Sequence, residues 1–244
     1  DAEQLAFAYE DGPLLLTSTL NLTRTNKQYV NADVLNITAT NGDAGIFTGG
    51  ASYGGDQSIA VNEVNLISTT TSGARAEIFL RDPNTEHDFS LNADDLNMTQ
   101  ANGGITSINN QGTVSNLILD DLTGTGEITG NFDITVNNLL SPGNSPGTLN
   151  LPTLTLGTSA TTLLEIESPS NLDQINVAGA AFLDGDLDIV LLSGFVPSAL
   201  EAFNFINAGG GVSGGFNVTN GDFAGTSLSN DYRVTYTGTP ATLP

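Results

Sequence analysis

The acids best placed for chemistry are Asp184, Asp186 and Asp188, which alternate with Gly and Leu. On an extended strand these side chains would share one face, about 7 Å apart. Carboxylates that close raise one another's pKa unless a cation or solvent screens them. Calcium prefers such oxygen ligands, so these acids are the candidate metal site. The alternative is a solvated acidic face, which is favoured because Ile189 and Phe195 stand where an EF-hand loop needs Gly and Glu.

Residues that could support catalysis are scarce. The single histidine, His87, lies in a polar run typical of a turn, and the sequence has no Gly-x-Ser-x-Gly elbow. A carbohydrate-active enzyme on a β-helical fold would need an Arg or Lys base, for which the pair Arg81-Asp82 is the best candidate. A surface ion pair explains that pair equally well. The sequence therefore predicts a protein that is not an enzyme.

The composition is strongly acidic and free of cysteine. Five Lys and Arg stand against 27 Asp and Glu, a formal net charge of −22. Such a chain repels nucleic-acid phosphates and anionic lipids and attracts divalent cations. No apolar stretch approaches the roughly 18 residues of a membrane span. A start at Asp1 without Met or leader is expected after export, so we expect an extracellular protein at the cell surface or in a matrix.

An internal repeat is the strongest signal of fold. The segment 30–38 (VNADVLNIT) recurs 61 residues later as 91–99 (LNADDLNMT), and the echo continues to Asn-Gly at 41–42 and 102–103. A looser copy lies midway at 61–68, and a weaker fourth is expected at 114–119. The period is therefore roughly 30 residues, a length typical of solenoids.

Each copy is a short strand in which apolar residues alternate with Asn, Asp and Thr. A single strand of this kind cannot bury its apolar face, whereas stacked copies can. The predicted fold is all-β: a parallel β-helix or solenoid of repeats over 27–138, followed by stacked strands over 139–244. Valine, leucine and isoleucine are expected inside, with Asn and Asp outside.

The first segment, 1–26, is predicted to be a separate strand or cap. Leu5, Phe7 and Tyr9 alternate with small or polar residues before a turn at Asp11-Gly12-Pro13. This strand could leave its own subunit and complete a neighbour's sheet. The alternative, which is favoured, is that it pairs at home as the first strand of its own fold.

The second half begins with two Pro-Gly turns in Ser141–Leu149 (SPGNSPGTL), which predict a tight corner between strands. A helical turn is the alternative to strand only at 198–203. Strands are expected at 154–156, 163–167, 175–177, 183–192, 203–206 and 232–236.

The corner and the strands after it resemble exported bacterial surface proteins, namely autotransporter passenger domains and proteins with the PEP-CTERM sorting signal. The resemblance covers about 100 residues and includes the segments 164–166, 173–179, 183–187, 194–197 and 203–206. It implies export, a β-helical or stacked-strand fold, and a surface or matrix role without catalytic residues. The printed residues include neither the translocating barrel nor the Pro-Glu-Pro tail of these families, as expected if an anchor was cleaved or if the likeness is more distant.

These observations favour a non-enzymatic structural subunit that assembles into a bacterial surface filament or biofilm matrix, with a second copy of itself as the main partner. N-terminal strand exchange is one route to assembly. The alternatives are a monomeric β-helical adhesin and a carbohydrate-active β-helix enzyme. Divalent cations and surface glycans are the other candidate partners. Calcium is the one candidate cofactor.

Overall fold

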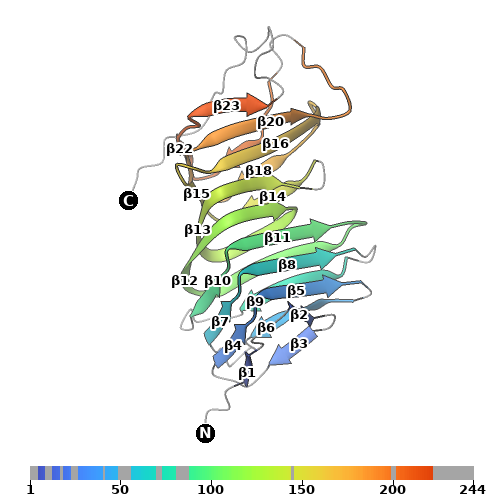
Figure 1. The fold of residues 1–244 in the computed structure, drawn as a ribbon, viewed down its shortest axis with the longest axis vertical. Coiled ribbons are helices and arrows are strands. Elements are labelled where there is room, and N and C mark those ends of the chain that lie inside the picture. The colour runs from blue at the N-terminus through green and yellow to red at the C-terminus, as the bar shows by residue number, and fades with distance from the viewer. Residues whose placement is uncertain are drawn as a thin grey trace.

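The computed structural model describes residues 5–8, 13–16, 19–22, 27–40, 42–48, 56–69, 73–80, 88–143, 146–198 and 202–221. These residues form a β-solenoid whose strands stack along the long axis, from β1 near the N-terminus to β23 at the far end (Figure 1). The described part contains no helix, so none there is long and apolar enough to cross a membrane. The predicted all-β solenoid is confirmed.

Each turn contributes one strand to each of three faces, and strands on a face pair in parallel with those one turn away. The first face contains the last parts of β12 (Ile105–Gly124) and β13 (Gly126–Pro142) together with β2 (Pro13–Leu16), β5 (Val34–Ala39), β8 (Glu63–Ser68), β11 (Asp95–Gln100), β16 (Thr161–Ser168), β20 (Asp186–Leu191) and β23 (Val218–Gly221).

The second face is built in the same way. It contains the first parts of β12 and β13 together with β3 (Thr19–Leu22), β6 (Ala44–Thr48), β9 (Arg75–Leu80), β14 (Thr148–Leu151), β18 (Gln174–Val177) and β21 (Ile206–Ala208).

The third face completes each turn. It contains the middle parts of β12 and β13 together with β1 (Leu5–Ala8), β4 (Lys27–Asn31), β7 (Asp56–Ala60), β10 (Phe89–Asn92), β15 (Leu154–Leu156), β19 (Ala181–Leu183) and β22 (Val212–Gly214). Here β1, β4, β7 and β10 form a four-stranded sheet of their own, because β10 pairs with β7 and not with β12. The short β17 (Asn171–Leu172) is antiparallel to β16.

The sequence repeat corresponds to successive turns of the first face. Asn36, Asn65 and Asn97 stack in register at separations of 29 and 32 residues, and amide hydrogen bonds of 3.0 and 3.1 Å join them. The next turns are shorter: Thr123 donates to Asn97 across 26 residues, and Thr125 reaches Gly143 across 18. The roughly 30-residue period therefore holds for the turns that carry the clear copies.

The fourth copy lies elsewhere than its sequence suggests. Asp121 and Leu122, not the segment 114–119, pair with Asp95 and Leu96 on the first face. The segment 114–119 belongs to the third face, where it pairs with the middle of β13. The segment resembles the repeat because strands on all three faces have the same alternation of apolar and polar residues.

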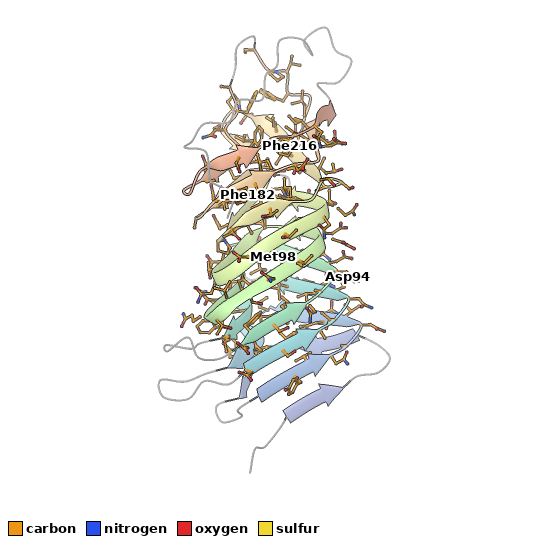
Figure 2. All side chains as sticks on the ribbon, turned by 90° about the vertical axis from the view of Figure 1, so that its left-hand side faces the viewer. Asp94, Met98, Phe182 and Phe216 are labelled. Atoms are coloured by element: carbon orange, nitrogen blue, oxygen red, sulfur yellow. The ribbon has the colours of Figure 1, made fainter. Side chains whose placement is uncertain are left out.

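The interior is a continuous apolar column, as predicted. On the second face Ile46, Ile78, Ile108 and Ile128 lie in register and are fully buried. Met98 lies inside the stack, whereas Asp94 lies at its edge (Figure 2). Burial of each large apolar side chain contributes about 1.5–3 kcal/mol, so stacking supplies the core that one turn lacks.

Several interior positions carry polar side chains, namely Ser68, Thr106, Asn110 and Thr162. Thr162 is fully buried between Leu140 and Leu187 on the first face, and its Oγ1 has no hydrogen-bond partner. We expect Thr162→Val to raise the free energy of unfolding by about 1–2 kcal/mol, because valine keeps the shape and removes a buried unsatisfied hydroxyl. Urea unfolding measures this change.

The matched control is Thr155→Val at an exposed position of β15, where a change within about 0.5 kcal/mol is expected. Destabilisation by Thr162→Val would show that the hydroxyl has a partner in solution.

Candidate functional site

The acids of the candidate metal site are split by a turn. Asp186 and Asp188 lie on β20 and alternate with buried Leu187 and Ile189, as expected. Asp184 does not share that strand, because Gly185 adopts a φ of +72° and turns the chain before β20 begins. The prediction of three carboxylates on one strand face is therefore wrong at Asp184.

The partners of these acids are local. Asp184 Oδ1 accepts hydrogen bonds from the Gly185 N–H at 2.8 Å and from Asn217 Nδ2 at 2.9 Å, so it closes the turn. Asp188 Oδ1 is buried without a hydrogen-bond partner. Within the described ranges, no three His, Cys, Asp or Glu side chains form a group suited to a metal ion.

The first strand pairs within its own chain. In β1, Leu5 lies in register with Gln28 and Phe7 with Val30 of β4, in parallel. Tyr9 lies outside the described residues, as do His87 and Arg81, the residues considered for catalysis.

Both ends of the stack consist of strands that pair on one side. Among the described strands, β1, β2 and β3 pair only with β4, β5 and β6. At the other end β21, β22 and β23 pair only with β18, β19 and β20. Backbone N–H and C=O groups along such edges can pair with another chain.

An acidic corner, formed by Glu63, Asp94, Asp95, Asp120 and Asp121, runs between the third and first faces. Glu63, Asp95 and Asp121 stack in register on consecutive turns. Burial raises the pKa of Asp95, and the charges of Asp121, Glu63, Asp94 and Asp120 raise it further. The corner therefore concentrates negative charge along the axis, which attracts cations and repels polyanions. Sequence reasoning did not assemble it, although the register of the repeat would have done so.

A groove with a volume of about 660 Å³ crosses the second face. Asn150, Asn176 and Asn207 line it and form a ladder of amide hydrogen bonds of 3.1 Å, and no lining residue is charged. Amides offer both donors and acceptors, so the groove suits an uncharged hydroxylated ligand better than an ionic one.

The Pro-Gly corner is fastened by a buried acid, Asp173. The corner lies between β13 and β14, as predicted. Asp173 is fully buried, and its two oxygens accept the N–H groups of Gly147 at 2.7 Å and Glu165 at 2.8 Å. Gly147 is required there, because a Cβ would collide with the carbonyl oxygen of Gly143. The segment 173–179 and the corner are thus two parts of one clasp.

No family model, curated protein or solved structure matches this chain.

The clasp predicts a specific pH dependence. Burial raises the pKa of Asp173 to about 6 from 3.8, although its two backbone hydrogen bonds act in the opposite direction. Between about pH 4 and 6 the unfolded chain has lost this proton and the folded chain keeps it, so the free energy of unfolding falls as pH rises. We expect a loss of up to about 3 kcal/mol across this window, measured by urea unfolding at each pH.

Asp173→Asn removes the titration together with one of the two backbone hydrogen bonds. The stability difference between the parent and this variant should therefore shrink from pH 4 to pH 7. Asp133→Asn, at an exposed position of β13, is the control and should keep the parent's profile. An identical profile in Asp173→Asn would mean that Asp173 does not titrate in this window.

Proposed function

We propose that this chain is a non-enzymatic extracellular structural protein, a self-assembling subunit of a bacterial surface filament or biofilm matrix. The observation that carries the proposal is that, among the described strands, those at both ends of the stack pair on one side only. Each end offers three parallel edges, one on each face.

The two ends match one another in direction and in face. On head-to-tail stacking, β22 of one copy would meet β1 of the next on the third face. Likewise β23 would meet β2 on the first face, and β21 would meet β3 on the second. Every new pairing would be parallel, as within the chain. In such a contact, one end of a subunit binds the opposite end of the next subunit. Each added subunit leaves a free end, so the assembly grows into a filament unless it closes into a ring.

Strand exchange at the N-terminus is a second route to the same assembly. The pairing of β1 with β4 could form between subunits with the same residues that form it within one chain. Deletion of residues 1–12 separates the two routes: exchange requires the β1 strand, whereas stacking through β2 and β3 does not.

An extracellular location is supported by the chain's composition. A net charge of −22 keeps the surface soluble and repels nucleic acids and anionic membranes, and the absence of Cys allows folding without oxidation. The resemblance of the Pro-Gly corner to exported surface proteins supports the same location.

A monomeric adhesin is the second candidate. The uncharged groove lined by Asn150, Asn176 and Asn207 favours it, because a surface glycan would find amide donors and acceptors there without charge repulsion.

Negative-stain electron microscopy and crosslinking of the purified chain test the proposal. Leu15 and Asn220 occupy equivalent first-face positions at opposite ends, paired with Asn36 and Asp188. Because the chain contains no Cys, the double variant Leu15→Cys/Asn220→Cys has one thiol at each end. We expect filaments, and a ladder of covalent multimers after treatment with a short thiol crosslinker.

Each single-Cys variant is the matched control and can give at most dimers. Filaments without a ladder would contradict head-to-tail stacking. If filaments also vanish on deletion of residues 1–12 while the chain stays folded, strand exchange is the route. Dispersed monomers under all conditions would contradict the structural-subunit proposal and favour the adhesin.

A further inference from the structure

Two oxygen atoms without hydrogen-bond partners lie two residues apart on the outside of the second face. Ser107 is only 2% exposed, and its Oγ has no partner. Asn109, two residues further along β12, donates from Nδ2 to Thr129 Oγ1 at 2.8 Å, but its Oδ1 is buried and unpartnered. Buried polar atoms in this state cost free energy unless another group satisfies them.

Both side chains face outward. Thr106, Ile108 and Asn110 are buried in register with the interior residues Ala76, Ile78 and Leu80 of β9. Because alternate side chains of a strand point to opposite faces, Ser107 and Asn109 lie on the outer side of the same strand, about 7 Å apart.

Two glutamates flank Ser107 on the adjacent turns. Glu77 of β9 and Glu127 of β13 each pair in register with Ser107. Strands lie about 4.8 Å apart, so Ser107 sits midway between two carboxylate-bearing positions separated by about 10 Å. Both side chains are long enough to meet above the serine hydroxyl.

We propose that Glu77, Glu127, Ser107 and Asn109 form a calcium site on the second face. Two carboxylates, a hydroxyl and an amide carbonyl supply four oxygen ligands, and water completes the shell. Calcium accepts six to eight oxygens at about 2.3–2.6 Å in irregular geometry, whereas magnesium demands a near-ideal octahedron. The two unpartnered oxygens distinguish this site from the acidic corner, where an amide donates to Glu63 and another to Asp121.

The charges around the site are mostly negative and would attract a cation. Burial raises the pKa of Glu77, and Asp43 and Glu127 raise it further, against the opposing charge of Arg75. The backbone N–H of Arg75 donates to Asp43 Oδ1 at 2.8 Å, which holds Asp43 on the turn beside Glu77. Phe79 lies in register with Asn109, and its ring packs edge-to-face against that of Phe47. A bound cation would offset both the burial and the repulsion.

Calcium titration of the full chain, by calorimetry and by thermal unfolding with calcium or chelator, tests the site. We expect calcium to raise the melting temperature, and Glu77→Gln or Glu127→Gln to weaken binding by about tenfold or more. Glu63→Gln removes the same charge from the acidic corner, and Asp186→Asn removes one from β20. Both controls should keep the parent's affinity.

Ser107→Ala is a second test of the site, which can be used if the glutamine variants fold poorly. In chelator this variant should be as stable as the parent or slightly more stable, because it loses only an unpartnered hydroxyl. With calcium its affinity should fall. No calcium response in the parent, or equal affinity in the parent and in all three site variants, would overturn the proposal. Loss of affinity in Asp186→Asn alone would instead place the ion at β20.

Discussion

Hydrogen bonds between the backbones of successive turns are the interaction on which the rest of this structure depends. Most of the described strands pair both with a strand one turn earlier and with a strand one turn later, and nearly all pairings are parallel and in register. Register fixes which residue lies above which, so each position along a turn becomes a column parallel to the axis. The chemistry of a column is then set by residues that are 17 to 32 positions apart in the sequence.

When successive turns carry the same kind of side chain in one column, its effect on the structure adds up along the axis. Isoleucine on isoleucine gives a dry, close-packed interior, and asparagine on asparagine gives chains of amide hydrogen bonds on the surface. Acid on acid has the opposite effect, because like charges held one strand spacing apart repel. Burial raises the pKa of Asp95, and the neighbouring acids raise it further. In the column of Glu77, Ser107 and Glu127, the serine separates the two carboxylates by two strand spacings, which leaves room for the proposed cation between them.

The sequence allowed the solenoid to be predicted because two clear copies of one strand differ in few residues, and their 61-residue offset spans two turns of 29 and 32 residues. The pairing of residues after Asn97 could not be predicted from the sequence. There the turns shorten to 26 and then 18 residues, and the copies of the repeat are no longer recognisable. The segment 114–119 was therefore assigned to the wrong face. Local pattern also concealed the turn at Gly185, where only a positive φ separates Asp184 from its neighbours.

Other residues could not be predicted from the sequence because their roles depend on long-range contacts. The role of Asp173 depends on Gly147, 26 residues earlier, and on the complete burial of its carboxyl group. Neither property is visible in the residues beside it. The same holds for Ser107, an ordinary polar residue until the register places a glutamate on either side.

The stacking direction also determines how the molecule responds to mechanical load. The strands run across the long axis, so the bonds between turns point along it (Figure 1). Tension between the two ends therefore opens one turn at a time, as in a zipper, instead of shearing many bonds together. Each opened turn of 17 to 32 residues releases about 60 to 110 Å of extended chain. A chain that opens in this way lengthens in steps under load, one turn at a time.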